Sequence, residues 1–176
     1  DDLVGGSSYV ESGTGQGTAG QLDTGDTISG GDDADLITGD NALLTRDAGI
    51  PKSPITQGRF DTDAPASAPM VQRSIQLYDL GDGPVPNTSG GDDITGDNGC
   101  DAILGQSGND RTKGNADGDY AEGGPGRDWL EGNGGDDDLV GGSSVIFGTD
   151  TALTTQGQPD TGDAVFGGTG DDVVLG

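Results

Sequence analysis

The sequence predicts an all-β fold of short stacked strands, and three periodic features support this prediction. Between residues 105 and 142 glycine recurs every nine residues, at Gly105, Gly114, Gly123, Gly132 and Gly141. Aspartate keeps the same period five places after each of the first four glycines, and an apolar residue follows two places after most of these aspartates. Glycine permits the left-handed backbone that a tight turn needs, so each unit has room for a turn and a strand of about three residues.

The composition argues against an ordinary globular core. The chain of 176 residues has 37 glycines, only 28% hydrophobic residues and a formal net charge of -25. Its 32 acidic residues comprise 29 aspartates and three glutamates, a bias typical of turns because the short aspartate side chain reaches back to its own backbone. The charge indicates bound cations and disfavours nucleic acid as a partner, since phosphate would be repelled.

Absent residue types exclude several functions. The chain contains no histidine, which removes Ser/His/Asp and Cys/His nucleophilic systems and the commonest zinc ligand. The single cysteine, Cys100, permits no internal disulfide, and neither its role nor the redox compartment follows from the sequence. No apolar run approaches the ~18 residues of a membrane span, so we expect no membrane insertion. Because no initiator Met or signal segment opens the chain, we expect it to be part of a longer protein.

Six consecutive nine-residue units share one register between residues 87 and 142. Their sixth position is always aspartate, their eighth is mostly apolar, and their fourth is glycine in all units but one. The pattern G-G-x-G-x-D-x-U-x, where U is a large apolar residue, resembles the RTX, or haemolysin-type, calcium-binding nonapeptide family. Shorter blocks at 1–6, 23–41 and 158–176 follow the same rule, so the resemblance covers more than half of the chain.

The resemblance implies a parallel β-roll, a right-handed β-solenoid with about 18 residues per coil, in which Ca²⁺ ions lie between successive loops. It also implies that the sixth-position aspartates are the metal ligands. These are Asp92, Asp101, Asp110, Asp119, Asp128 and Asp137 in the regular units, and Asp1, Asp26, Asp35, Asp163 and Asp172 in the shorter blocks. Asp33 and Asp117 replace the fourth-position glycine, and the unit at 21–29 lacks the leading glycine pair, so we expect distorted loops or incomplete sites there.

Stacking of such coils would arrange the aspartates in two rows. Two units per coil place like loops on like loops at a spacing of about 4.8 Å. The two rows would be Asp92, Asp110 and Asp128 along one edge, and Asp101, Asp119 and Asp137 along the other. In each strand the eighth position points inward and the seventh and ninth outward, which leaves a thin core. We therefore expect calcium binding to supply most of the folding free energy, and the calcium-free chain to be unfolded.

The donor chemistry also indicates calcium. Carboxylates and loop carbonyls are oxygen-only ligands, which suit Ca²⁺ better than Mg²⁺ because Mg²⁺ demands tighter octahedral geometry. The alternative is that the aspartates are solvated turn formers. Turn residues alone would not hold a fixed nine-residue phase.

A longer repeat of about 136 residues overlies the short one, since DDLVGGSS at 1–8 recurs at 137–144 and DTGD at 23–26 recurs at 160–163. We therefore expect a tandem array in which the number of repeats is open. The predicted organisation is a β-roll block at 1–44 with a Gly/Ser/Thr-rich excursion at 7–22, an inserted arm at 45–86, a regular roll at 87–142, an excursion at 143–157, and the next roll block starting at 158–176.

The inserted arm at 45–86 differs in composition from the roll. It holds six of the eight prolines and four of the seven basic residues, and proline at this density blocks regular ladders. Its stretch VQRSIQLYD alternates, which predicts a strand or hairpin arm with Val71, Arg73, Ile75 and Leu77 on one face. The arm is either a surface loop that closes on its own roll or a contact to a neighbouring copy or chain.

Outward side chains of successive coils should form cross-strand pairs. We expect Arg111 to pair with Asp93 and to lie over the ring of Trp129, and Lys113 to pair with Glu131. Stacking of a glycan on Trp129 is the alternative.

These features predict an extracellular module, secreted, at a cell surface or in a matrix filament, that folds on Ca²⁺ into a stiff rod or fibre segment and contacts neighbouring copies. The alternative is the calcium-dependent C-terminal secretion and folding roll of a type I secreted lipase or protease, although one block of repeats would suffice for export. An ice- or glycan-binding adhesin segment is a third hypothesis, but Thr38, Thr95 and Thr112 form no flat threonine ladder. We expect no enzymatic activity, because metal-bound, ionised carboxylates cannot serve in acid–base catalysis.

Overall fold

The computed structural model of the chain describes residues 2–6, 22–46, 73–77, 89–143 and 161–176. Strands are the only regular elements in these ranges, so the predicted all-β class is confirmed. The strands are β1 (Asp2–Val4), β2 (Thr27–Gly31), β3 (Leu36–Thr38), β4 (Ala42–Arg46), β5 (Arg73–Leu77), β6 (Asp93–Asn98), β7 (Ala102–Leu104), β8 (Arg111–Ala116), β9 (Tyr120–Glu122), β10 (Trp129–Gly134), β11 (Asp138–Val140), β12 (Ala164–Thr169) and β13 (Val173–Leu175).

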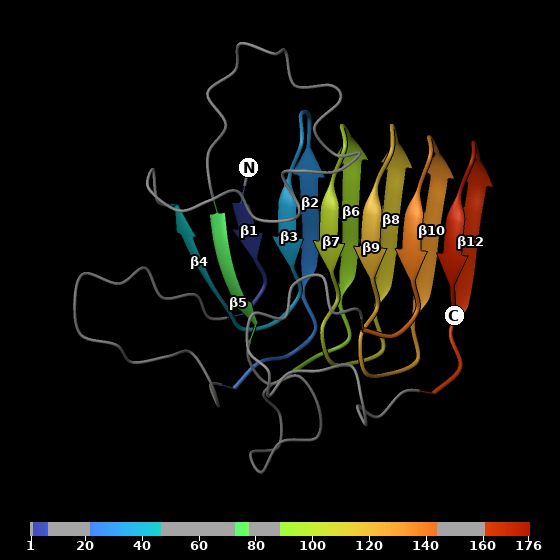
Figure 1. Cartoon of the computed structure of the whole chain (residues 1–176). Helices are drawn as coiled ribbons and strands as arrows, with labels where there is room; N and C mark the ends of the chain where they lie inside the picture. The colour runs from blue at the N-terminus through green and yellow to red at the C-terminus, as the bar shows by residue number, and fades with distance from the viewer. Residues whose placement is uncertain (1, 7–21, 47–72, 78–88, 144–160) are drawn as a thin grey trace.

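Two parallel sheets make up the body of the molecule (Figure 1). The six-stranded sheet has the order β1-β3-β7-β9-β11-β13, and the five-stranded sheet has the order β12-β10-β8-β6-β2. Consecutive strands alternate between the two sheets, and we call each consecutive pair a layer: β2–β3, β6–β7, β8–β9, β10–β11 and β12–β13. The parallel sheets agree with the prediction, and the arrangement fits a β-solenoid.

The register between layers follows the sequence period. Trp129 of β10 pairs with Arg111 of β8, and Tyr120 of β9 pairs with Ala102 of β7, so that partners in these layers lie two nine-residue units apart in the chain. Where the nine-residue period is interrupted, the register is kept over a longer chain distance. Thr27 of β2 pairs with Asp93 of β6, for example, across the inserted arm.

The two sheets share an apolar core. Its buried members come from the eighth position of each unit, as the alternation of strand side chains predicts. They are Ile37, Ile94, Ile103, Ala121, Leu130 and Leu139, with Leu3, Ile28 and Val165 packed against them. Thr112 occupies the same position in β8 and is fully buried, so the core is locally more polar there.

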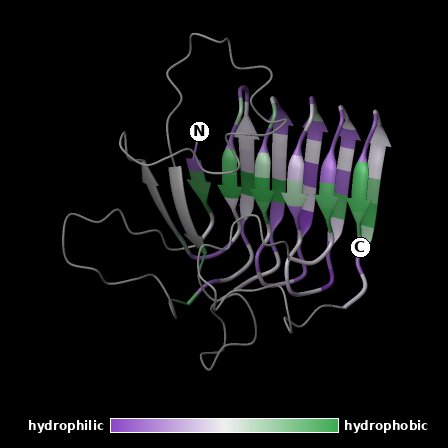
Figure 2. Ribbon diagram, viewed as in Figure 1, coloured by the Kyte–Doolittle hydropathy of each residue, from purple (hydrophilic) through white to green (hydrophobic). Residues whose placement is uncertain are grey.

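A second apolar cluster lies on the opposite face of the six-stranded sheet. It comprises Leu36, Ala102, Leu104 and Tyr120 of the sheet, together with Ala42 and Leu77, and Val4 packs against it. The sheet members occupy seventh and ninth positions, which point outward as predicted but are buried rather than solvated. The prediction of a single thin core is therefore wrong for this sheet. Figure 2 shows that hydrophobic residues occur on neighbouring strands of this sheet.

The cover of this second cluster is the two-stranded antiparallel sheet β4–β5. Ala42 of β4 pairs with Leu77 of β5, and both side chains are buried against the six-stranded sheet. The predicted strand in VQRSIQLYD is thus present at Arg73–Leu77, and Leu77 at its C-terminal end packs on the six-stranded sheet of the same chain. The proposed single face of Val71, Arg73 and Ile75 lies outside the described side chains, as do the arm residues 47–72 and 78–88.

Candidate metal centre

The predicted site aspartates lie in two rows along the turns between the sheets. Each row runs through five layers in the order of the strands. The first row is Asp26, Asp92, Asp110, Asp128 and Asp163, and the second is Asp35, Asp101, Asp119, Asp137 and Asp172. The two predicted edges are confirmed, and the shorter blocks extend them. Asp1 lies outside the described residues.

In every row aspartate after the first of its row, one carboxylate oxygen ties the layer to the preceding one. Oδ1 of Asp110 accepts a hydrogen bond from the backbone N–H of Asp92 at 2.8 Å, and Oδ1 of Asp128 accepts one from Asp110 at 2.8 Å. The second row repeats the contact, with the N–H of Asp101 donating to Oδ1 of Asp119 at 2.9 Å. This ladder makes the nine-residue phase of aspartate a structural requirement, because each loop needs an acceptor at the same height.

The other oxygen, Oδ2, is buried and accepts no hydrogen bond in six of the aspartates. Within the described residues these are Asp26, Asp92, Asp101, Asp110, Asp119 and Asp137. A buried polar atom without a partner is rare in proteins, and a repeated one indicates a ligand that supplies the missing contact.

A glycine lies directly beside each of these Oδ2 atoms, at a position where no side chain would fit. A methyl group added to Gly105 would lie 2.6 Å from Oδ2 of Asp110 and 2.7 Å from the carbonyl oxygen of Gly123 in the next layer. At Gly96 the corresponding distances are 2.2 Å to Oδ2 of Asp101 and 2.9 Å to the carbonyl oxygen of Gly114. The first-position glycine, having no side chain, thus lets a carboxylate oxygen and a main-chain carbonyl oxygen of the next layer come close together, and both are donor types that Ca²⁺ prefers.

The carboxylates are electrostatically unfavourable as they stand. Burial raises the pKa of Asp110 and Asp119 to about 8, and repulsion from the aspartates above and below in the same row adds to the effect. Burial likewise raises the pKa of Asp101 to about 7 and that of Asp92 to about 6. A row of buried carboxylates therefore needs protons or cations to neutralise it.

The loops with a non-glycine fourth position keep the turn. Asp33 and Asp117 both have a φ of +73°, in the left-handed region that glycine takes at this position in other units. Aspartate tolerates this conformation because its short side chain can hydrogen-bond locally. The second row of aspartates is continuous past both loops, so the expected distortion does not interrupt it.

The donor set is spread between side chains and backbone. Among the described residues no group of three or more Cys, Asp or Glu side chains converges as a metal cluster. The candidate centres instead combine a row carboxylate with a main-chain carbonyl of an adjacent layer, as Asp110 and Gly123 do. The residues present therefore fit a hard, oxygen-seeking cation and offer nothing to a thiolate- or imidazole-seeking one.

Asp40 is a buried carboxylate that the periodic pattern missed. Its Oδ1 accepts from the N–H of Gly90 at 2.9 Å and its Oδ2 from the N–H of Ser107 at 3.0 Å. Burial raises its pKa to about 8. Because Asp40 precedes the inserted arm and Gly90 follows it, this side chain fixes the points where the chain leaves and re-enters the layers. Asp40 occupies the second position of its unit, where the residue type varies from unit to unit, so the repeat pattern does not predict a role for it.

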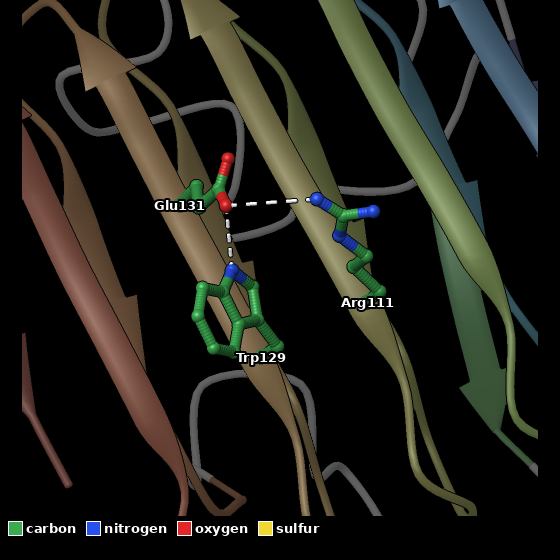
Figure 3. A network of polar contacts seen from close by, with 3 residues as sticks. All are labelled: Arg111, Trp129 and Glu131. Atoms are coloured by element: carbon green, nitrogen blue, oxygen red, sulfur yellow. Dashed lines mark hydrogen bonds and ion pairs between the residues drawn. The ribbon is translucent and has the colours of Figure 1, made fainter.

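The outer face of the five-stranded sheet carries an exposed polar network (Figure 3). Oε1 of Glu131 lies 3.8 Å from an Arg111 nitrogen and accepts a hydrogen bond of 2.6 Å from Nε1 of Trp129. Arg111 thus pairs with the diagonal Glu131 and not with Asp93 opposite it, which corrects the predicted pairing, and the expected Lys113–Glu131 pair is not formed within the described residues. The Trp129 ring instead packs on Phe166 at 4.9 Å between centroids.

Substitution of a first-position glycine by alanine tests whether the close contact between this glycine and Oδ2 matters for calcium binding. In Gly114→Ala the new Cβ would lie 2.1 Å from Oδ2 of Asp119, so the carboxylate must move although no charge changes. We expect an overpacking cost of about 1–3 kcal/mol and a higher calcium midpoint of folding. The matched control is Gly134→Ala, whose nearest atoms would lie at 3.5 Å. Equal shifts of the calcium midpoint in the two variants would contradict a specific role of the contact between Gly114 and Asp119.

The raised pKa values predict an inverse pH dependence without metal. Asp110 and Asp119 have folded-state pKa values of about 8, above the ordinary 3.8, so between these limits the folded chain holds more protons than the unfolded chain. The contribution of their protonation to folding stability is therefore fully present below pH 3.8 and is lost as the pH rises through about 8. After removal of divalent ions, the folded fraction in circular dichroism should therefore rise from pH 8 to pH 5. A constant folded fraction would show that these carboxylates are already ionised in the fold.

No helix long and apolar enough to cross a membrane is present in the described ranges. In comparisons with known proteins, no family model matches the chain, and neither a curated protein nor a solved structure shows significant similarity to it.

Proposed function

We propose that this chain is an extracellular calcium-binding structural or adhesive repeat module, which folds on Ca²⁺ into a stiff rod or fibre segment. In this proposal each layer closes into one coil of a right-handed β-roll, made of two nine-residue units. The observation that carries it is the pair of aspartate rows, each with buried Oδ2 atoms that accept no hydrogen bond and face a glycine. The two-unit spacing between partners in adjacent layers supports the coil size.

The row aspartates would hold the ions together with main-chain carbonyls of the adjacent layer. In the first row, Oδ2 of Asp110 and the carbonyl of Gly123 would belong to one centre. In the second, Oδ2 of Asp119 would serve the centre beside Gly114. A bound calcium ion supplies positive charge and oxygen coordination, which lowers the pKa of the carboxylates and keeps them ionised. The aspartates in turn orient the loops, since each Oδ1 already ties two layers together.

Calcium dependence follows from the electrostatics. Without cations, the fold must keep several carboxylates either protonated or charged and buried, and both states oppose folding at neutral pH. Metal binding to the folded state alone would shift the equilibrium towards the roll by mass action. Such a module suits a compartment with millimolar calcium, which is the reason for placing it outside the cell.

A structural role is favoured over catalysis. Most of the row aspartates are buried between layers, and the Oδ2 atoms without a hydrogen bond lie against a glycine. A substrate has no access to buried carboxylates, whereas carboxylate and carbonyl oxygens are ligands for a single bound ion. The rod is favoured over a secretion roll of an enzyme because the long repeat continues the layers beyond one block.

A calcium titration tests the proposal. Far-UV circular dichroism of the full chain should show a steep coil-to-β transition as Ca²⁺ rises from micromolar to millimolar concentration, and Mg²⁺ at the same concentration should not produce it. Light scattering on the same sample separates a fibre-forming module, whose scattering rises with folding, from a monomeric export roll. A chain already fully folded in chelator at pH 8 would refute a calcium-driven fold.

A further inference from the structure

The last layer, β12–β13, exposes apolar side chains that its counterparts bury. Val173, Val174 and Leu175 of β13 are 47%, 44% and 59% exposed. In strands β3, β7, β9 and β11 the residue equivalent to Val174 is at most 2% exposed, as at Ile37 and Leu139. An exposed apolar patch of this kind marks an interaction surface.

The chain contains a covered version of the same layer. The long repeat relates β13 to β3 and β12 to β2, with Val173, Val174 and Leu175 equivalent to Leu36, Ile37 and Thr38. The structure keeps this equivalence in its pairing. Strand β13 pairs with β11 in the way that β3 pairs with β1, the sequence-related strand of the other copy.

The covering segments of the first copy are therefore known. Strand β7 pairs with the free side of β3, and β6 pairs with β2. Ala42 and Leu77 of β4–β5 pack with Leu36 on the outer face. All of these segments follow β3 in the chain. At the last layer the equivalent sides of β12 and β13 have no strand beside them within the described residues.

We propose that the last layer is a docking surface for a second copy of this chain's own repeat. The β6 of that copy would pair with β12, its β7 would pair with β13, and its β4–β5 would cover Val173 and Leu175. The inference deepens the proposed function and rests on it, because it names the partner that continues the rod. The occupant is specified by the chain itself, since it already shows which sequence covers an equivalent layer.

Successive repeats then form one continuous pair of sheets rather than separate domains. One repeat contributes the four layers β2–β3, β6–β7, β8–β9 and β10–β11. At a strand spacing of about 4.8 Å, each repeat lengthens the rod by about 19 Å. One β4–β5 sheet would recur at the same side of the rod in every repeat, so the inserted arm would project at this interval.

A longer chain tests the docking, in which residues 40–143 are repeated directly after Gly176. Gly176 is equivalent to Gly39, so this junction continues the repeat in register. In saturating calcium, we expect amide exchange of Val173–Leu175 to slow at least about tenfold compared with the 176-residue chain. Small-angle scattering should show a single rod, longer by about 14 Å because the added segment supplies three layers. Unchanged exchange at these residues, or two bodies joined flexibly, would overturn the proposal.

The matched variant is Val174→Asp in both chains. A docked copy buries this side chain, so the substitution should restore fast exchange of Val173–Leu175 in the longer chain, while the shorter chain should tolerate it because the site is exposed there. Equal tolerance in both chains would refute docking. The calcium titration of the 176-residue chain is a separate experiment. A chain that folds without calcium would refute calcium-driven folding and would leave the docking of a second repeat to be judged by amide exchange and scattering.

Discussion

Replacing Asp119 and Asp137 together by asparagine should raise the calcium midpoint of folding at least about tenfold, equivalent to about 1.4 kcal/mol or more. Asparagine keeps the Oδ1 acceptor that ties each layer to the one before it, at 2.9 Å from the N–H of Asp101 and of Asp119 respectively. It replaces the buried Oδ2 by an amide nitrogen, which repels a cation. The substitution therefore removes the metal donor and leaves the loop ladder in place.

The same substitution separates calcium binding from simple turn formation. Burial raises the pKa of both aspartates, so asparagine should not destabilise the metal-free fold and should relieve part of its charge repulsion. The control is Asp117→Asn with Asp136→Asn, which removes the same charge from exposed positions of neighbouring loops. Isothermal calorimetry and circular dichroism would measure the midpoint. If both double variants bind calcium as the parent does, the row aspartates are turn residues and not ligands.

Removal of the β4–β5 sheet should cost about 5 kcal/mol or more, a large part of the stability of an ordinary domain. The deletion joins Asn41 to Ser89 by a short linker, which is geometrically feasible because Asp40 accepts a hydrogen bond from Gly90. It removes Ala42 and Leu77 and exposes Leu36, Leu104 and Tyr120. Each buried leucine contributes roughly 1.5–3 kcal/mol by burial. The deletion therefore removes most of the stabilisation that the second cluster gives to the six-stranded sheet.

A smaller deletion provides the matched comparison. Arg46 and Arg73 are directly opposite in the antiparallel register, so an Asn-Gly turn can replace residues 47–72 and leave β4–β5 complete. This shorter chain should keep the urea midpoint of the parent in saturating calcium, while the larger deletion lowers it or unfolds the chain. Similar midpoints for both deletions would show that the second cluster contributes little to stability.

Much of the candidate site is predictable from the sequence because the nine-residue period maps directly onto the stacking of layers. Glycine allows the turn, aspartate accepts a hydrogen bond from the loop of the preceding layer, and the eighth residue faces the core, so each role recurs with the repeat. Both aspartate rows and the interior position of Ile94, Ile103 and Leu130 follow from this register alone.

The second apolar cluster is indicated in the sequence by the seventh and ninth positions of some units, but the nine-residue consensus does not show it. In alternate units at least one of the seventh and ninth positions is apolar or aromatic, as at Ala102, Leu104 and Tyr120, whereas an intervening unit carries the charges Arg111 and Lys113. The run Ala102–Leu104, which is apolar on both faces of one strand, is the local signal for a sheet with two buried faces. The ion pair of Arg111 with Glu131 is less accessible to such reasoning, because long side chains choose between opposite and diagonal partners at similar energies.

The strand class, the register of the layers, and the two rows of aspartates with their glycine partners follow from the amino-acid sequence, because all of these repeat with a fixed period and depend on neighbours in the chain. Three further features are visible only in the folded chain: β5 pairs with β4, Leu77 covers the six-stranded sheet, and Asp40 accepts a hydrogen bond from Gly90 where the chain re-enters the layers. These contacts join segments without a common period. Their partners are selected by burial and by backbone hydrogen bonds that exist only once the layers are stacked.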